Sequence, residues 1–266
     1  MRDRRGLAFE LEHADEIDAF RRFGGHFEHA AVDLACALLR PGDVALDIGA
    51  NIGAFTVPMA RAVTESGRVY AFEPFAPARR RLTRSLELNR VDNVEVLAVA
   101  VTESVGEVEL VDYGPGYESW STVAPRQIEI GQGTVHAVGR ANVPSTTLDA
   151  FSGAAGLEHV ALAKIDVEGA EGLVLAGATG LLRRGAIDVL MVEASDNTLE
   201  AAGTSVREML RELERLQLEV FELGSDGDLV AVRVGGRVDW LMQLVAVTAT
   251  GRERLSLSGR HLASSA

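Results

Sequence analysis

The chain has 266 residues, of which 47% are hydrophobic and 24% are charged, and its formal net charge is −13. This hydrophobic fraction is enough for the full core of a globular protein, in one large domain or two small ones. The acidic balance, with no run of basic residues, argues against a nucleic acid partner. A single cysteine, Cys36, rules out an internal disulfide and fits the reducing cytoplasm, where we expect the protein to lie without membrane contact.

The first 40 residues precede the regularly patterned part of the chain. Residues 1–24 are charged and weakly patterned, and we expect a lead-in segment or a peripheral helix there. The apolar stretch over residues 30–39 predicts a helix. We therefore interpret residues 1–40 as a mainly helical N-terminal segment that caps a site formed by the rest of the chain.

A strand, a glycine turn and a helix follow in close succession. The apolar run Val44–Ile48 is too short for a globular helix and is bounded by glycine on both sides, which predicts a buried strand. Gly49 and Gly53 allow backbone to approach a ligand closely, and the helix expected over residues 55–62 directs free N–H groups at the turn. This arrangement is typical of a nucleotide cradle at the carboxyl end of a strand.

The spacing of this turn does not match the dinucleotide fingerprint G-x-G-x-x-G. Counted from Gly49, that pattern needs glycine where Asn51 and Ala54 stand. The carboxylate of Asp47 would repel a pyrophosphate, because like charges repel. It suits positive groups such as the ammonium and sulfonium of S-adenosylmethionine (SAM). An NAD-dependent oxidoreductase is the competing interpretation.

The next strand, expected over residues 68–72, is followed by an acid, Glu73, and by Pro74. An acid at this place can accept hydrogen bonds from both hydroxyls of a ribose. Because NAD and SAM both contain a ribose, Glu73 supports a nucleoside ligand without distinguishing between the two.

Residues 78–89 predict an amphipathic helix, with Leu82, Leu86 and Leu88 facing inward and the four arginines of this stretch facing outward. Residues 93–101 then predict one continuous third strand. The apolar alternation in this stretch is typical of a strand in the sheet core.

An added strand over residues 106–111 leads into a stretch of different composition. Residues 112–143 are rich in glycine, serine and threonine, and a segment of this length without a clear pattern indicates a lid or a mobile connection. Trp120 and Ser121 lie inside it, where an aromatic ring and a hydroxyl suit an acceptor pocket. Trp120 covering the core is an equally good interpretation.

The rest of the chain alternates between strand and helix patterns. We expect helices that start near residue 145, at residue 169 and at a Thr204 cap, strands over residues 159–166 and 187–193, and a terminal antiparallel pair over residues 218–223 and 240–247 around a turn at 225–227. From residue 251 we expect a frayed tail. The alternation predicts one α/β domain over residues 41–250, with a mostly parallel sheet, a C-terminal antiparallel pair and helices on both faces.

Three motifs carry a resemblance to a known family. They are Asp47-Ile48-Gly49-Ala50-Asn51-Ile52-Gly53, Phe72-Glu73-Pro74 and Lys164-Ile165-Asp166-Val167-Glu168-Gly169-Ala170-Glu171. In these motifs the chain resembles the FkbM family of SAM-dependent methyltransferases, from about Phe27 to about Glu193. The resemblance implies a Rossmann-like class I methyltransferase that converts SAM to S-adenosylhomocysteine and methylates a hydroxyl of a small molecule, often a sugar or a polyketide-type natural product.

The same resemblance adds residues to the expected cofactor site. It places Phe27 and Glu28 close to the cofactor, and Ala100 and Val101 against the adenine. The complete set of expected cofactor residues is Phe27, Glu28, Asp47, Gly49, Ala50, Asn51, Gly53, Glu73, Pro74, Ala100, Val101 and Asp166.

Acids stand at the ends of four expected strands. They are Asp47, Glu73, Asp166 and Glu193. Because ligands of open α/β sheets bind beyond the carboxyl ends of the strands, we expect these acids to converge on one site. The expected reaction is an in-line displacement of the methyl group by an acceptor oxygen, and Glu193 joins Trp120 and Ser121 as an expected acceptor-binding residue.

An alcohol acceptor loses its proton during attack, and Asp166 and Glu168 are the expected catalytic bases. In an extended strand end their side chains point the same way. Either carboxylate could instead stabilise the sulfonium. Lys164 has the same parity, and an ion pair with Asp166 would lower the basicity of that carboxylate. Glu171 is expected to hold the local turn.

Two other interpretations stay open. Oxygen ligands from Asp166, Glu193, Asp196 and Asn197 would suit Mg²⁺, although the resemblance favours a site without metal. The cofactor residues would equally suit a protein that binds SAM without turnover.

Overall fold

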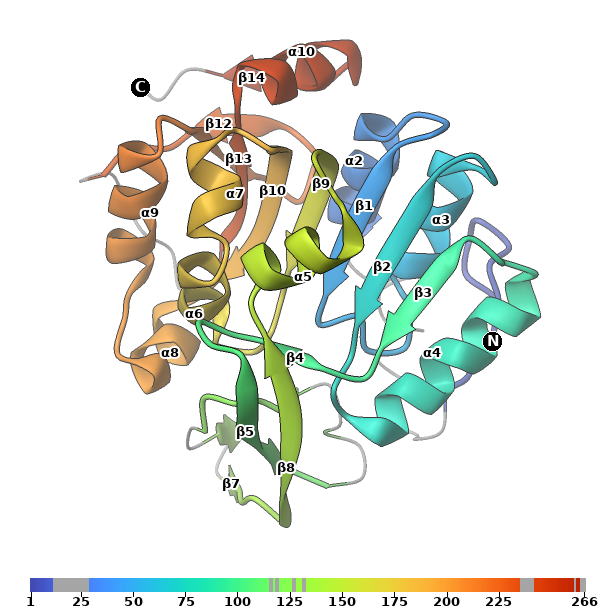
Figure 1. Cartoon of the computed structure of the whole chain (residues 1–266), viewed down its shortest axis with the longest axis vertical. Helices are drawn as coiled ribbons and strands as arrows, with labels where there is room; N and C mark the ends of the chain where they lie inside the picture. The colour runs from blue at the N-terminus through green and yellow to red at the C-terminus, as the bar shows by residue number, and fades with distance from the viewer. Residues whose placement is uncertain are drawn as a thin grey trace.

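The structure is a computed structural model, and it describes residues 1–11, 29–114, 117, 120–125, 128–130, 133–234, 242–260 and 262–263. A nine-stranded sheet forms its centre (Figure 1). The strand order is β14 (Leu262–Ala263), β12 (Leu229–Ala231), β11 (Glu219–Leu223), β13 (Met242–Val247), β10 (Ile187–Ala194), β9 (Val160–Ile165), β1 (Val44–Ile48), β2 (Arg68–Phe72) and β3 (Val94–Leu97).

Strands β10, β9, β1, β2 and β3 are parallel to one another. Strands β1 and β9 are almost continuously apolar and buried, because a parallel sheet covered on both faces leaves few residues at the surface. The mostly parallel α/β sheet predicted from the sequence is confirmed.

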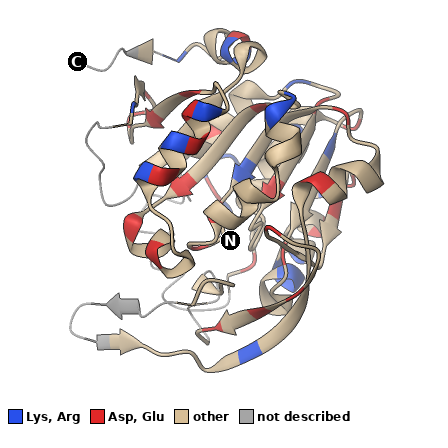
Figure 2. Cartoon of the chain, turned by 60° about the vertical axis from the view of Figure 1, so that its left-hand side comes forward, with Lys and Arg blue, Asp and Glu red and all other residues tan. Residues whose placement is uncertain are grey.

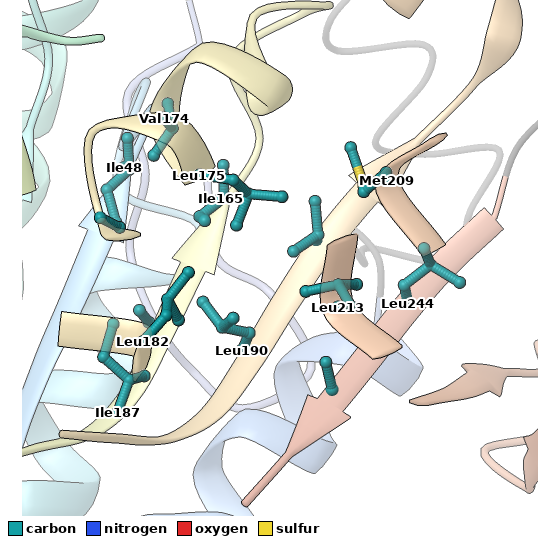
Figure 3. Close-up of a cluster of buried hydrophobic side chains, with 14 of the residues drawn as sticks. Ile48, Ile165, Val174, Leu175, Leu182, Ile187, Leu190, Met209, Leu213 and Leu244 are labelled. Carbon is teal, nitrogen blue, oxygen red and sulfur yellow. The ribbon is translucent and has the colours of Figure 1, made fainter. Parts of the chain in front are cut away.

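Helices cover both faces of this sheet. Helices α2 (His29–Leu38), α3 (Thr56–Val63), α4 (Ala76–Asn89) and α10 (Ala249–Leu257) lie on one face, and α5 (Leu148–Ala155), α6 (Glu171–Ala176), α7 (Thr179–Arg183) and α9 (Val206–Arg215) lie on the other. Hydrophobic side chains fill the space between the sheet and its helices. On the second face they join β1, β9 and β10 to α6, α7 and α9, through side chains such as Ile48, Leu190 and Leu213 (Figure 3).

Helix α9 has the regular amphipathic pattern that its sequence predicts. Charged residues of both signs alternate along its outer face (Figure 2), and Met209, Leu210 and Leu213 are buried on the inner face. Its N-cap is Ser205, whose hydroxyl accepts a hydrogen bond from Glu208 N at 3.2 Å. The predicted cap at Thr204 is therefore wrong by one residue.

Helix α4 differs from the prediction on both of its faces. Leu82 and Leu86 are buried as expected, but Leu88 is 38% exposed, and Arg81 is buried. Arg79 donates hydrogen bonds to the carbonyl oxygens of Glu73 and Pro74 instead of facing solvent. The inward face of the helix is thus rotated, so that two of its four arginines lie against protein.

The predicted third strand is split between two sheets. Strand β3 ends at Leu97, and Ala100–Val101 form a separate strand, β4, in a three-stranded sheet with β5 (Gly106–Asp112) and β8 (Gly139–Thr146). Strand β8 begins in the segment predicted to be a lid or mobile connection, residues 112–143, and β6 (Ile128–Ile130) and β7 (Gly133–Val135) pair within that segment. Parts of this segment are therefore regular sheet.

The C-terminal region also holds more structure than predicted. Strands β11 and β13 pair antiparallel, as expected. The turn near Asp226 leads into β12 rather than directly into β13. From residue 251 the chain was predicted to be frayed, but α10 and β14 occupy most of this stretch. The prediction is wrong because buried Leu255 and the ion pairs of Arg254 anchor the stretch to the rest of the protein. In the described part of the chain no helix is long and apolar enough to cross a membrane.

Arg254 fastens α10 to the amino-terminal end of the sheet. Its Nη1 lies 2.6 Å from Oδ2 of Asp43, just before β1, and its Nε lies 2.7 Å from Oδ2 of Asp188 in β10. The Asp188 side chain is 1% exposed, and His159 Nε2 lies 2.9 Å from its Oδ1. The guanidinium thus balances a carboxylate that water does not reach.

We expect the substitution Arg254→Met to lower the free energy of unfolding by about 3–5 kcal/mol, because it leaves Asp188 buried without its cation. Urea denaturation measures this loss. The matched control is Arg215→Met in α9, where the ion pair with Glu212 has side chains 75% and 44% exposed. That change should cost less than about 1 kcal/mol, and equal losses in the two variants would contradict the prediction.

Candidate cofactor site

The acids predicted to converge come to one edge of the main sheet. Ile48 of β1 is level with Phe72 of β2 and with Ile165 of β9, and Val192 of β10 is also level with Ile165. Because these strands are parallel, their carboxyl ends lie along the same edge, beside the small sheet of β4, β5 and β8 (Figure 1). The acids at or next to these strand ends are Asp47, Glu73, Asp166 and Glu193.

The turn after β1 uses its N–H groups within the protein. Gly49 N and Ala50 N both donate to the carbonyl oxygen of Phe72 at 3.0 Å. Asn51 has a φ of 47°, in the left-handed region that asparagine tolerates better than most residues, and its N–H donates to Glu73 Oε2 at 2.8 Å. The N–H groups of these three turn residues are therefore already used within the protein.

Both glycines of the turn provide space for the protein's own chain. A Cβ on Gly49 would lie 1.8 Å from the carbonyl oxygen of Asp166, and a Cβ on Gly53 would lie 2.8 Å from Leu82 Cδ1. The sequence pattern predicts this space for a ligand. In the structure, Gly49 instead lets the end of β1 pack against the end of β9, which brings Asp47 close to Asp166.

Glu73 is held in place by two backbone N–H groups. Its Oε2 accepts the N–H of Asn51 and its Oε1 accepts the N–H of Phe75, each at 2.8 Å. Burial raises the pKa of Glu73 to about 7, although both hydrogen bonds and the charge of Lys164 act in the opposite direction. A carboxylate oriented in this way has lone pairs left for two ribose hydroxyls.

Asp47 is fully enclosed. Thr56 Oγ1, at the start of α3, donates a hydrogen bond to Asp47 Oδ2 at 2.5 Å. Lys164 Nζ lies 3.6 Å from Asp47 Oδ1. Burial raises the pKa of Asp47, and the charge of Lys164 lowers it in part. The carboxylate predicted to face a cationic ligand is thus closed off from solvent by the protein.

Asp166 lies at the open side of the same cluster. Lys164 Nζ lies 3.1 Å from Asp166 Oδ2, and the Asp166 side chain is 21% exposed. The ammonium also donates to the carbonyl oxygen of Gly49 at 3.0 Å and lies 5.1 Å from the ring centroid of Phe55. The predicted pairing of Lys164 with Asp166 is confirmed, and the second carboxylate on the same lysine is a new finding.

The turn after β9 departs from extended backbone. Glu168 has a φ of 57° and Gly169 a φ of 106°, so the alternation assumed for Asp166 and Glu168 ends at Ile165 and does not fix their directions. Glu171 Oε1 accepts the N–H groups of Val167 at 3.0 Å and of Gly169 at 3.1 Å. The predicted role of Glu171 in holding this turn is confirmed.

The segment after β5 contacts this turn. Thr122 Oγ1 donates to the carbonyl oxygen of Val167 at 3.3 Å. Trp120 stacks against Tyr117 with ring centroids 5.0 Å apart, over the buried pair Val111 and Tyr113. Ser121 Oγ, next to them, is enclosed and has no hydrogen-bond partner among the described residues.

An open groove of about 450 Å³ is formed by residues of β5, β7 and β8 and of the chain between them. Its lining combines apolar side chains with an aromatic hydroxyl, an imidazole and a guanidinium. The lining residues are Val111, Tyr113, Pro125, Val135, His136, Ala137 and Arg140.

The remaining expected site residues are more scattered. Ala100 and Val101 are buried in β4, where they pair with Ser145 and Thr146 rather than leaving a strand of the main sheet. Glu193 is half-buried opposite Gln243 of β13. Phe27 and Glu28 lie outside the described residues.

Of the residues considered above as magnesium ligands, Asp196 is bound to another part of the protein and Asn197 is exposed. Asp196, at the start of α8 (Asp196–Leu199), accepts the N–H of Val206 at 2.7 Å and so connects α8 to α9. Across the ranges that the structure describes, no group of three or more His, Cys, Asp or Glu side chains is arranged to hold a metal ion.

Sequence reasoning missed Phe55, Thr56 and Thr122. Phe55 and Thr56 surround the Asp47–Lys164 pair, and their position at the start of the helix after the turn is the signal that would have indicated them. Thr122 lies in a segment without periodicity, and its neighbour Ser121 was the residue chosen there.

Comparison with known proteins is consistent with this geometry. Residues 47–220 match the model of the methyltransferase FkbM domain. Among curated proteins, the chain is 34% identical over 168 residues to AMB antimetabolite synthetase AmbE of Pseudomonas aeruginosa, a match that covers 53% of this chain and 8% of that protein. It is 30% identical over 158 residues to methyltransferase sdnD of Sordaria araneosa, covering 50% of this chain and 59% of that protein.

The solved structures that the chain resembles are more distant. A SAM-dependent O-methyltransferase from Thermotoga maritima is 15% identical, with a TM-score of 0.46, over 88% of this chain and 71% of that one. Fibrillarin from Aeropyrum pernix with bound SAM is 16% identical, with a TM-score of 0.42, over 78% and 67%. The match of the family model over most of the chain shows that the protein belongs to the FkbM family of methyltransferases, whose cofactor is SAM.

Proposed function

We propose that this protein transfers the methyl group of SAM to a hydroxyl of a small molecule of the sugar or polyketide type. The observation that supports this most directly is the Asp166 carboxylate. It is partly exposed at the carboxyl edge of the sheet, is held by Lys164, and belongs to the turn that Thr122 contacts from residues 112–143, here called the inserted segment. In this proposal the carboxylate lies between the cofactor and the inserted segment, from where it can act on an acceptor.

The residues at this edge fit SAM. Glu73 offers an oriented carboxylate for the ribose hydroxyls. Asn51 Oδ1 is an enclosed oxygen without a hydrogen-bond partner among the described residues, so it can accept from a donor on the cofactor. In this proposal Asp166 faces the methionine end, Pro74, Ala100 and Val101 lie toward the adenine, and Phe27 and Glu28 close the site.

The chain's own residues would then carry the reaction as follows. SAM supplies an electrophilic methyl group. Trp120, Ser121 and Glu193 orient the acceptor, and Asp166 takes the hydroxyl proton as the oxygen attacks; Glu168 is the second candidate for that proton. The inserted segment excludes water and aligns the acceptor, which can supply roughly 7–11 kcal/mol of the barrier reduction.

The natural-product class of the acceptor is supported by a relative. The P. aeruginosa protein with 34% identity is named an antimetabolite synthetase. The groove beside Tyr113 and Arg140 is wide enough for part of a small molecule and belongs to the same segment as Trp120. The chain spans only 8% and 59% of the two curated relatives.

The competing cofactor, NAD, meets a turn that suits it poorly. A pyrophosphate needs backbone N–H donors, and those of Gly49, Ala50 and Asn51 are already donated to β2 and Glu73. Calorimetric titration with SAM, S-adenosylhomocysteine and NAD tests the cofactor directly. Methylation of sugar and polyketide alcohols, followed by product mass, tests the transfer, and binding of SAM without S-adenosylhomocysteine formation would favour a protein without turnover.

We expect Asp166→Asn to lower kcat by at least about 100-fold with the best acceptor of such a panel, because the transferred proton loses its base. Steady-state rates of S-adenosylhomocysteine formation measure this. The comparison variant is Glu168→Gln, which should keep most of the activity. If Glu168→Gln is the inactive variant instead, the proton goes to Glu168, and the assignment to Asp166 is wrong.

A further inference from the structure

Lys164 is the only lysine of the chain, and it is 4% exposed. It lies between two carboxylates of unequal accessibility. Asp47 is 0% exposed and also accepts the hydroxyl of Thr56, whereas the Asp166 side chain is 21% exposed. Both carboxylates were expected to face the cofactor, but only Asp166 reaches a surface from which a ligand can be contacted.

We propose that Lys164 is a positioning residue that keeps the Asp47 charge inside the protein and holds Asp166 as the carboxylate that faces the cationic end of SAM. Asp47 then acts on the cofactor through Lys164 and the Gly49 turn, without touching it. The part of this inference that concerns ligand binding rests on the cofactor placement proposed above, and the part that concerns charge pairing does not.

The geometry supports these different roles of Asp47 and Asp166 in two ways. The ammonium donates to the carbonyl oxygen of Gly49, so the same group that balances Asp47 also fixes the turn beside it. Asp47 of β1 is level with Lys164 of β9 in the parallel register, which places both side chains on the face covered by α3. A carboxylate in this position needs a cation from within the protein.

The charged groups around Asp47 come from known elements. Strand β9 and the turn after it contribute Lys164 and Asp166, α3 contributes the uncharged hydroxyl of Thr56, and Glu73 follows β2. Burial raises the pKa of Asp47, and Lys164 is the largest influence in the opposite direction. Without Lys164, the pKa of Asp47 would therefore rise further.

The first test compares Lys164→Met with the double variant Lys164→Met/Asp47→Asn, without cofactor or acceptor. A buried carboxyl whose pKa is raised keeps its full stability below the unfolded pKa of about 4 and loses it as the pH rises. The unfolding equilibrium constant of the single variant should therefore rise, relative to that of the double variant, by up to about tenfold per pH unit above pH 4. The two should be similar near pH 4.

Two outcomes would overturn the charge pairing. One is a difference between the single and double variants that does not change with pH, which would mean that Lys164 serves only as packing and as a hydrogen-bond donor to Gly49. The other is failure of both variants to fold at any pH, since removing the Asp47 charge should then have rescued the fold. A folded double variant beside an unfolded single variant supports the pairing.

The second test measures which carboxylate faces the cofactor, by titrating Asp166→Asn and Asp47→Asn with SAM and with S-adenosylhomocysteine, which lacks the sulfonium charge. Asp166→Asn should weaken SAM about tenfold more than S-adenosylhomocysteine. Asp47→Asn should change both affinities by the same factor. A selective loss of SAM in Asp47→Asn would overturn the inference, whereas absence of methyl transfer to any alcohol would overturn only the proposed function.

Discussion

Binding of SAM at pH 6 should release close to one proton from the wild-type protein and none from Glu73→Gln. Burial raises the pKa of Glu73 to about 7 in the free protein, so most molecules hold this carboxyl protonated at pH 6. Ribose hydroxyls donate to the ionised form and favour it. Calorimetry in two buffers of different ionisation enthalpy measures the released proton. The SAM affinity should also fall up to about tenfold per pH unit below pH 7.

The carboxyl of Glu73 should also make the stability of the free protein depend on pH. Stability should fall as the pH rises, whereas the SAM affinity should rise. Because the folded pKa lies above the ordinary value of 4.5, Glu73 contributes stability that is complete below about pH 4.5 and is lost as the pH rises through 7. The full effect corresponds to about 3 kcal/mol, and Glu73→Gln should lack it. The control is Glu95→Gln, at an exposed ion pair with Arg68, which should leave proton release unchanged. Proton release that persists in Glu73→Gln would contradict the assignment.

The substitution Gly49→Ala should unfold the protein or lower its free energy of unfolding by more than about 4 kcal/mol. The added Cβ would lie 1.8 Å from the backbone oxygen of Asp166, and φ at this position is +81°. Since the obstructing atom belongs to the backbone, β1 and β9 would have to separate. Effects of this size are uncommon for single substitutions and indicate steric disruption of a packed element.

A matched control separates the clash from the backbone angle. Gly203 has a φ of +74°, and no atom lies within 4 Å of a Cβ built there. Gly203→Ala should therefore cost only the left-handed conformation, about 1–2 kcal/mol. Urea denaturation of both variants measures the difference, and similar losses would show that the approach of β9 to Gly49 is not what makes glycine necessary.

Local patterns predict the strands of this protein well and their partners poorly. The mainly apolar stretches Val44–Ile48 and Val160–Ile165 are short, and the first is followed by glycine and the second by an acid; both are buried strands. By contrast, Ala100 and Val101 continue the apolar pattern of β3, and nothing local shows that the chain changes sheets after Leu97. Pairing of β4 with β8 depends on residues more than 40 positions away.

The candidate site shows the same limit. The glycine turn, Glu73 and the turn after β9 could be predicted because each motif is continuous in sequence. The contact of Lys164 with Asp47 joins residues 117 positions apart on neighbouring strands and depends on the register between them. Arg254 likewise joins Asp43 and Asp188 across three elements, which is why the C-terminal stretch was expected to be frayed.

The pairing of β5 with β8 makes the inserted segment an exchangeable unit. The two strands pair along their whole common length, from Gly106 opposite Ser145 to Asp112 opposite Gly139, so the chain between them is closed at its base. Lengthening such a closed loop costs only about 0.6 kcal/mol for each doubling of its length. The stretch between Asp112 and Gly139 can therefore change in length at little cost in folding free energy, while the pairing of β5 with β8 stays as it is.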